Sequence, residues 1–373
     1  MNTIPYLLLF GSSESDSDIH YLAQTHIPDP LALLYSPQKT VVFASALEYH
    51  RLKEAMPQAL VLNLNSFVPT HETWSLPTII AHYLKDNHCS NIQVKSSFPV
   101  GMADALRSLG IKLDIISITQ LPQREIKTAT EIEEIRQCAD ITQRAYHLVE
   151  TLLGEASIQK NGQLYYQNEP LTADFVRSAI ENECFLHGAI AENTIVACGD
   201  DACDPHEIGH GVLQAHQFIV VDCFPYLRRS HYFSDVTRTF IKGKPNEQQR
   251  HLYETVAAGQ QRAIDRIKNG AFADEIMANT LAFFESQGYE TSLHASPPKG
   301  MFHSLGHGIG IDIHEAPSVS LKHTLLRTNM VCTVEPGLYY RGIGGVRIED
   351  DVLITDKGCE VITHNIPYHW IID

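Results

Sequence analysis

The sequence predicts an α/β domain followed by an α+β domain, and three observations support this division. The chain has 373 residues, enough for two domains that each bury a core. In the first third, short apolar runs alternate with helical stretches, which is typical of an α/β domain. Further on, long helices are interspersed with apolar runs joined by turns, which indicates an α+β domain with hairpins. We place the two domains at residues 1–124 and 125–373.

The first domain is expected to contain at least four strands and three helices. Short apolar runs predict strands at residues 6–10, 32–34, 40–43 and 59–62. Helical spacing predicts helices at residues 48–56, 76–85 and 102–109. The apolar run at residues 6–10 has neither a basic segment before it nor a small-residue cleavage site after it. We therefore interpret it as a strand rather than a signal peptide.

A long helix is expected to open the second domain. Thr128 with Glu131, and equally Thr130 with Glu133, have the spacing of a capping box, in which the hydroxyl and the carboxylate satisfy free N–H groups of the first turn. Helical spacing continues to Gly154, which we expect to end the helix. Further helices are predicted at residues 173–186, 247–268 and 273–286, and strands at 218–223, 236–241, 331–334 and 346–355. A turn at residues 356–358 should lead into a hairpin partner at 360–363.

Composition excludes several classes of function. The formal net charge of −16 repels phosphate backbones, so no nucleic-acid partner is expected. No apolar run approaches the roughly 18 residues that cross a membrane. The eight cysteines form no C-x-x-C pair, which favours reduced thiols in a cytoplasmic protein over a zinc ribbon or a redox site.

Acidic residues recur in a paired pattern through the second domain. Asp222 ends an apolar run and Asp235 precedes the next one. Glu335 and Glu349 repeat this arrangement 113 and 114 residues later. Two hairpins that each offer two carboxylates can face each other across one site. Like charges 4 Å apart cost on the order of 4 kcal/mol at an effective dielectric of 20, and two divalent cations would remove that cost. An oxygen-rich donor set favours ions such as manganese or cobalt.

A histidine donor for the same site is available in a glycine-rich segment. His303, His307 and His314 lie within twelve positions, interleaved with small glycines. Glycine lets the backbone approach a buried ligand closely. Taken singly, each of these residues has a plainer explanation. Asp235 or Glu349 could pair with a nearby arginine, Arg238 or Arg347, and His307 could be a hydrogen-bonded core histidine.

Four sequence runs, taken together, resemble the aminopeptidase P, prolidase and methionine aminopeptidase family. They are SDVTRTF at 234–240, GHGIG at 306–310 with HEAP at 314–317, VEPGLY at 334–339 and GVRIED at 345–350. The resemblance implies the pita-bread fold for the second domain, about two-thirds of the chain. It also implies a creatinase-like α/β domain before it, as in the aminopeptidase P and prolidase branch.

The resemblance further implies roles for individual residues. The expected metal ligands are Asp222, Asp235, His307, Glu335 and Glu349, with Asp235 and Glu349 bridging two divalent ions, manganese before cobalt or zinc. Glu335 would also move the proton of the attacking water. The expected substrate-site residues are His206, His303, His314 and Arg347. The implied activity is hydrolysis of the N-terminal bond of a peptide substrate, with proline in the second position, by a homodimer.

One segment departs from the family pattern, and two alternatives to Xaa-Pro hydrolysis stay open. Family members often have Asp-x-Gly after the first ligand, whereas here Cys223, Phe224 and Pro225 follow Asp222, in a longer loop that carries Arg228 and Arg229. The first alternative is a metal-free binding protein of this fold or a creatinase-like C–N hydrolase. The retained ligand set argues against it. The second is a metallo-aminopeptidase with no proline preference.

Overall fold

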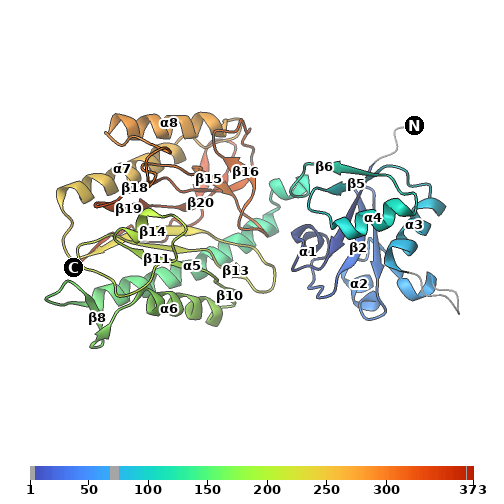
Figure 1. Ribbon diagram of the computed structural model, residues 1–373, viewed down its shortest axis with the longest axis horizontal. Helices are drawn as coiled ribbons and strands as arrows, with labels where there is room; N and C mark the ends of the chain where they lie inside the picture. Colours follow the sequence, from blue (N-terminus) through green and yellow to red (C-terminus); the bar gives the residue numbers. More distant parts are fainter. Residues whose placement is uncertain (1–4, 68–74, 367) are drawn as a thin grey trace. The chain divides into compact units, whose positions relative to one another are not determined.

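The computed structural model divides the chain into two units, Met1–Leu121 and Pro122–Asp373 (Figure 1). It describes residues 5–67, 75–366 and 368–373. The division falls three residues before the boundary expected at residue 124.

The first unit is built on a six-stranded mixed sheet in the order β4-β3-β2-β1-β5-β6. Its strands are β1 (Tyr6–Gly11), β2 (Leu31–Ser36), β3 (Lys39–Ala44), β4 (Leu60–Asn63), β5 (Ile92–Lys95) and β6 (Leu113–Ile116). Its helices are α1 (Ser17–Ala23), α2 (Tyr49–Ala55), α3 (Leu76–Asp86) and α4 (Val100–Ser108). The predicted α/β architecture of this part is confirmed.

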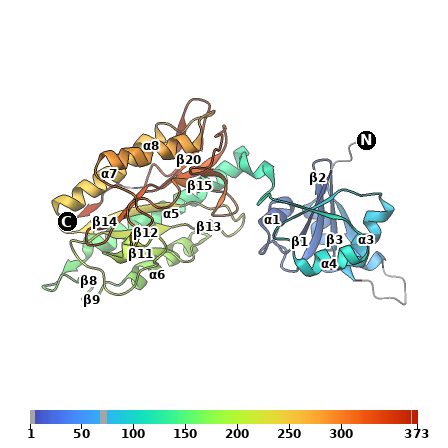
Figure 2. The same ribbon diagram turned by 45° about the horizontal axis from the view of Figure 1, so that its top comes forward.

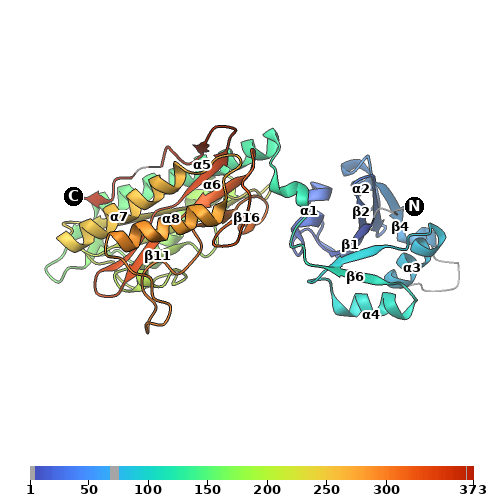
Figure 3. The ribbon, with the colours of Figure 1, turned by 90° about the horizontal axis from the view of Figure 1, so that it is seen from above.

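Each face of this sheet has its own core, because successive side chains of a strand point to opposite faces. Leu8 of β1 lies in one apolar cluster with residues of α3 and α4. Leu7 and Leu9 lie in a second cluster with residues of α1 and α2. Figure 3 shows the two helix pairs on opposite sides of the strands. Strands β5 and β6 and helix α1 were not predicted, since they are short and carry polar residues such as Lys95 and Asp114.

The second unit combines two sheets with two helix pairs. One sheet has the order β11-β12-β14-β22 and the other the order β16-β15-β17-β20-β21. The strands of the first are β11 (Ile195–Cys198), β12 (Ile219–Cys223), β14 (Val236–Lys242) and β22 (Ile371–Ile372). Those of the second are β15 (Gly306–Gly308), β16 (Glu315–Val319), β17 (Val331–Val334), β20 (Asp350–Ile354) and β21 (Cys359–Val361). A hairpin of β18 (Gly337–Tyr340) and β19 (Gly344–Arg347) accompanies them. The smaller pairings are β7 (Ser157–Ile158), β8 (Leu164–Tyr166) and β9 (Glu169–Pro170), and β10 (Ala189–Ile190) with β13 (Tyr226–Leu227).

The two larger sheets of the second unit lie between its two helix pairs (Figures 1 and 2). Helices α5 (Ala129–Glu155) and α6 (Ala173–Leu186) share one buried cluster with β11, β12 and β14. Helices α7 (Glu247–Ile264) and α8 (Ala273–Ser286) share a second cluster with the other sheet and hairpin. The hydroxyl of Tyr146 on α5 donates to the carbonyls of Val221 and Val236, at 2.9 and 2.6 Å, and so fixes the helix over strands β12 and β14.

Several predicted boundaries need correction. The expected strand at 346–355 is two strands, because residues 348 and 349 leave β19 to cross beside β14 before β20 begins. Gly154 lies inside α5, which ends one residue later, and α7 ends at Ile264 rather than residue 268. Of the two capping boxes considered, the one formed by Thr128 and Glu131 is present. Among the described helices, none is both long enough and apolar enough to span a membrane.

The cap of α5 should contribute measurably to stability. The side chain of Thr128 accepts from the N–H of Glu131 at 3.3 Å, and the Glu131 carboxylate accepts from the N–H of Thr128 at 2.7 Å. We expect Thr128→Ala to lower the free energy of unfolding by about 1 kcal/mol, since one N–H of the first turn loses its partner. Chemical denaturation measures this. Thr151→Ala, an exposed position late in the same helix, is the control and should cause no loss, because alanine is the better helix former. Equal losses in both variants would contradict the capping argument.

Candidate metal centre

Two antiparallel strand pairs bring the four predicted acids to one place. Asp222 lies on β12 and Asp235 directly precedes β14, its neighbour in the sheet. Glu335 directly follows β17 and Glu349 directly precedes β20, which pair in the same way. The N–H of Glu349 donates to the carbonyl of Thr237 at 3.0 Å, which joins the second pair to the first. The paired acids in the sequence therefore correspond to paired strand ends.

Asp235, His307 and Glu349 form a cluster whose possible ligand atoms all lie within 4.8 Å of one another. The Nε2 atom of His307 is 3.5 Å from Asp235 Oδ2 and 3.6 Å from Glu335 Oε1. Four of the five expected ligands thus surround one point. Asp222, the fifth, is close enough for its charge to raise the pKa of both Asp235 and Glu349.

Burial and mutual repulsion make this cluster electrostatically unfavourable without a cation. Burial raises the pKa of Asp235 well above its usual value, and the charges of Asp222, Asp351 and Glu335 raise it further. Burial also raises the pKa of Glu349 well above its usual value, with Asp235, Glu335 and Asp222 adding to it. The pKa of Glu335 rises mainly through burial. Perturbed carboxyl groups gathered in one place are typical of a functional site.

Three carboxylates each have a buried oxygen without a hydrogen-bond partner, and in two of them the other oxygen is held by the protein. The partnerless atoms are Asp222 Oδ1, Asp235 Oδ1 and Glu349 Oε1. The other oxygens are engaged: Asp222 Oδ2 accepts from Arg347 at 2.6 Å, and Glu349 Oε2 accepts from Thr237 at 2.8 Å. Buried polar atoms are almost always satisfied in folded proteins. Three such oxygens beside an imidazole nitrogen fit hard or borderline divalent cations.

His307 is oriented as a nitrogen donor toward the carboxylates. Its Nδ1 lies 3.2 Å from the carbonyl of Gly308, which can only accept, so a proton on Nδ1 would complete this hydrogen bond while Nε2 faces the acids. The adjacent glycines have a packing role. A Cβ on Gly306 would lie 2.0 Å from the carbonyl oxygen of Thr333, and one on Gly308 would lie 2.2 Å from that of Ala316. Glycine is therefore required here by neighbouring strands, rather than by a ligand as the sequence suggested.

The other three predicted histidines, His314, His303 and His206, differ in their exposure and hydrogen bonding. The ring of His314, which is exposed, lies 4.3 Å from that of His307, centroid to centroid. His303 is bonded at both nitrogens, through Nδ1 to the carbonyl of Ser304 at 2.7 Å and through Nε2 to the hydroxyl of Tyr339 at 2.9 Å. Burial and the charge of Arg347 lower its pKa to about 4, so the ring is neutral near pH 7. His206 is exposed, and its charge lowers the pKa of both His303 and His314.

Arg347 connects the two halves of the site. Its guanidinium donates to Asp222 at 2.6 Å, to Thr237 Oγ1 at 3.0 Å and to the hydroxyl of Tyr339 at 3.1 Å. Thr237 and Tyr339 were not among the predicted site residues. Both lie inside the sequence runs that carried the family resemblance. The runs therefore indicated the right segments but not the contacts of these two side chains.

The loop between Asp222 and Asp235 is a closed hairpin. Ser234 N–H donates to the carbonyl of Pro225 at 3.1 Å, and Leu227 N–H donates to that of Tyr232 at 3.0 Å. Arg229 donates to Glu134 on α5 at 2.9 Å, and the hydroxyl of Tyr232 donates to Glu131 on the same helix at 2.7 Å. The unusual residues after Asp222 therefore leave the spacing of the two acids intact.

Comparison with known proteins agrees with this geometry. The chain is 28% identical to an Xaa-Pro dipeptidase of Pyrococcus furiosus over 355 residues, 93% of this chain and 90% of that one. The structure of an Xaa-Pro dipeptidase from Bacillus anthracis matches with a TM-score of 0.83 at 25% identity, covering 99% of this chain and 95% of that one. An X-Pro aminopeptidase structure from Thermotoga maritima shares the fold, with a TM-score of 0.80 at 23% identity over 99% and 98% of the two chains.

These likenesses confirm the predicted fold class, with a pita-bread domain after the α/β domain. Residues 133–356, more than half of the chain, match the family described as metallopeptidase family M24. This match also confirms the expectation, made from the sequence, that the protein is a metallopeptidase, a class of hydrolase. The chain belongs to metallopeptidase family M24.

Proposed function

We propose that this protein hydrolyses the N-terminal peptide bond of Xaa-Pro peptides with two divalent metal ions. The observation that carries the proposal is the buried cluster of Asp235, Glu349 and His307, in which both carboxylates have an oxygen without a hydrogen-bond partner, as Asp222 also has. In this proposal Asp235 and Glu349 would serve both ions, Asp222 would serve one of them, and His307 and Glu335 would serve the other. When bound, such a pair polarises the scissile carbonyl and lowers the pKa of a water nucleophile.

Glu335 is the residue best suited to move a proton. Its side chain is 15% exposed, so it is reachable from solvent. Its pKa is raised by burial, which brings its proton affinity closer to neutral pH, where a general base works best. It accepts a proton at a carboxylate oxygen as the nucleophile attacks and returns it to the leaving amine.

The surrounding residues orient the substrate and stabilise developing charge. His314 presents an exposed ring next to His307, and we assign it contact with the substrate. Both nitrogens of His303 already have partners, so its role is to hold the Tyr339 hydroxyl beside Arg347. His206 is assigned a place at the substrate because its charge acts on both other histidines. Donors fixed before the reaction stabilise an oxyanion without reorganising.

Proline specificity rests on relatives rather than on a contact. The Pyrococcus furiosus and Bacillus anthracis proteins are named Xaa-Pro dipeptidases, and this chain matches nearly the whole of each. The match includes the first domain of this chain. This supports the aminopeptidase P and prolidase branch over the methionine aminopeptidases. Manganese as the native metal, a homodimer and a cytoplasmic location belong to the same proposal. The oxygen-rich donor set supports manganese. The free cysteines, which form no disulfide among the described residues, support a cytoplasmic location.

Activity on an Xaa-Pro dipeptide and on an Xaa-Pro tripeptide tests the proposal. We expect cleavage that a chelator abolishes and Mn²⁺ restores. Glu335→Gln should lower kcat by about 10²- to 10⁴-fold, because the proton acceptor is lost. Glu169→Gln, at an exposed glutamate of β9, is the control and should keep wild-type activity. Metal content is measured in parallel. A Glu335→Gln protein that binds both metals and keeps full activity would contradict the proton-transfer role, and failure of the wild type on both peptides would contradict the proline assignment.

Removal of metal should make stability depend on pH in a defined direction. Asp235, Glu335 and Glu349 have raised pKa values, and burial raises that of Asp351 to about 7, so the folded state holds protons that the unfolded state has released. Such groups stabilise the fold at low pH and lose that contribution as pH rises through their folded pKa. His303 has the opposite shift, but its effect ends at its usual pKa of 6.5.

Between pH 6.5 and about pH 8, the free energy of unfolding of chelated protein should therefore fall. Urea denaturation at several pH values measures it. Protein saturated with Mn²⁺ is the matched sample and should show a smaller fall, since the cations replace the protons. Stability of the chelated protein that rises across this interval would refute the electrostatic account.

A further inference from the structure

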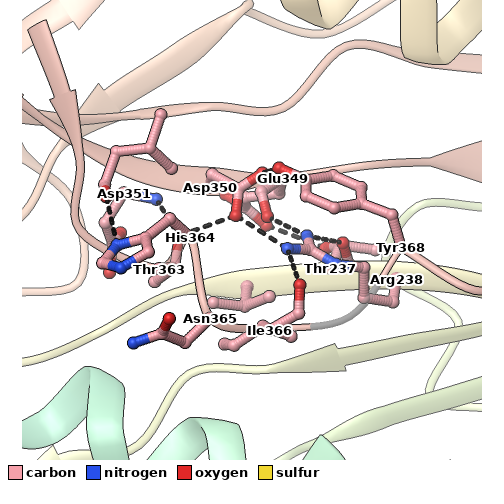
Figure 4. Close-up of polar contacts among 12 residues, drawn as sticks. Thr237, Arg238, Glu349, Asp350, Asp351, Thr363, His364, Asn365, Ile366 and Tyr368 are labelled. Atoms are coloured by element: carbon pink, nitrogen blue, oxygen red, sulfur yellow. Dashed lines mark hydrogen bonds and ion pairs between the residues drawn. The ribbon is translucent and has the colours of Figure 1, made fainter.

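Two acids directly follow Glu349, and the proposed function uses neither of them. Asp350 and Asp351 both have 0% exposure. Successive residues of a strand point to opposite faces, and Figure 4 shows the two side chains directed apart. Burying two carboxylates costs several kcal/mol per ion unless each is fully paired and hydrogen-bonded. Their partners therefore indicate what they do.

Asp350 accepts four hydrogen bonds and neutralises a buried arginine. Arg238, which is 1% exposed, donates to Oδ1 at 2.7 Å, and Thr363 donates to the same oxygen at 2.7 Å (Figure 4). Gln260 and the hydroxyl of Tyr368 donate to Oδ2, at 2.9 and 2.5 Å. The guanidinium also lies 4.3 Å from the centre of the Tyr368 ring. Asp350 thereby fixes the position of the Arg238 side chain.

Arg238 in turn holds the backbone of Glu349. Its Nη1 donates to the Glu349 carbonyl at 2.6 Å and to the Thr237 carbonyl at 3.0 Å. Glu349 also donates its N–H to the Thr237 carbonyl and accepts at Oε2 from the Thr237 hydroxyl. Its N–H, its carbonyl and one carboxylate oxygen are thus all held by β14, which leaves Oε1 as the single unpartnered polar atom of the residue.

Asp351 holds the other proposed bridging residue in the same manner. Its carboxylate accepts from the hydroxyl of Ser234 at 2.8 Å and from the N–H of Asp235 at 3.2 Å. Thr363 connects the two acids, because its hydroxyl accepts from the N–H of Asp351 at 3.2 Å and donates to Asp350. The backbone of each bridging carboxylate is therefore anchored by one of the two acids that follow Glu349.

We propose that Asp350, acting through Arg238, and Asp351 are positioning residues for Glu349 and Asp235. The proposal rests on the proposed function, in which these two carboxylates bridge the metal pair. Without cations the two like charges repel each other, and a flexible support would let them separate. Hydrogen bonds to their own backbone groups keep them close before metal arrives. Removal of the partners that orient metal ligands typically weakens metal affinity by about 10- to 100-fold.

A purely structural role is the competing account. Arg238 also donates to the carbonyl of Ile366 at 3.3 Å, and Tyr368 belongs to the same C-terminal segment. In that account the network serves only to fasten this segment to the strands beside it. The two accounts differ in one observable. Fastening affects the stability of metal-free protein, whereas positioning affects metal affinity among molecules that are folded.

Calorimetric titration of Mn²⁺ into metal-free, folded full-length protein separates the accounts. Asp351→Asn should bind Mn²⁺ about 10- to 100-fold more weakly than wild type. Asp351→Glu keeps the charge but moves the carboxylate, and it should also bind more weakly. Tyr368→Phe removes one of the four bonds to Asp350 from a partly exposed side chain and should show a smaller loss of affinity in the same direction. Tyr289→Phe loses a hydroxyl bond to His251 away from the site and is the matched control.

Asp350→Asn removes the carboxylate that pairs with Arg238 and risks unfolding. If this variant does not fold, Asp351→Glu and Tyr368→Phe carry the test. Wild-type Mn²⁺ affinity in both of these variants, with lowered unfolding midpoints alone, would overturn the positioning proposal and leave the proposed function standing. Wild-type affinity in Asp351→Glu with weakened affinity in Asp351→Asn would assign the effect to charge and would also overturn it. A wild-type protein that binds no Mn²⁺ would overturn the proposed function itself, and the positioning role with it.

Discussion

Repulsion between carboxylates in a site with little water is the constraint on which the second unit depends. Asp222, Asp235, Glu335 and Glu349 come from four strand ends, and the charges of the other three raise the pKa of Glu349. No local structure would gather them unaided. Backbone hydrogen bonds between β14 and the residues around Glu349 hold the two strand pairs together against this repulsion. The acids are kept close by groups that do not compete for their free oxygens.

Positive charge near the site is arranged to support the acids without filling the site. Arg347 pairs with Asp222 through one oxygen and leaves the other free. Arg238 is neutralised by Asp350 and donates to the carbonyl of Glu349. The two arginines thus pair with Asp350 and Asp222. Asp235 and Glu349, for which such a pair was the plainer explanation, have no arginine partner among the described contacts. That asymmetry favours a cation from solution as the missing counter-charge.

The sequence predicted helices and site residues correctly where residue spacing and residue type indicated the same feature. The helices at 173–186 and 273–286 have the predicted bounds, because a capping residue or a glycine marks their ends. The acids at strand ends were found because the pattern occurs twice. Strands β5 and β6 were missed since they are short and carry polar residues. The break between β19 and β20 was missed because Ile348 continues the apolar character of the run across the crossing. The roles of Thr237, Tyr339 and Asp351 depend on contacts across more than one strand, which no local pattern encodes.

The closed hairpin between Asp222 and Asp235 has a consequence for how this protein can diverge. Its stem is sealed by the bond from Ser234 to Pro225, and its side chains attach to α5 rather than to the acids. Residues can be gained or exchanged at its tip while the two carboxylates keep their places. Such a segment acts as a module whose sequence drifts independently of the chemistry beside it. Related chains can therefore differ in this segment while keeping the same charged centre.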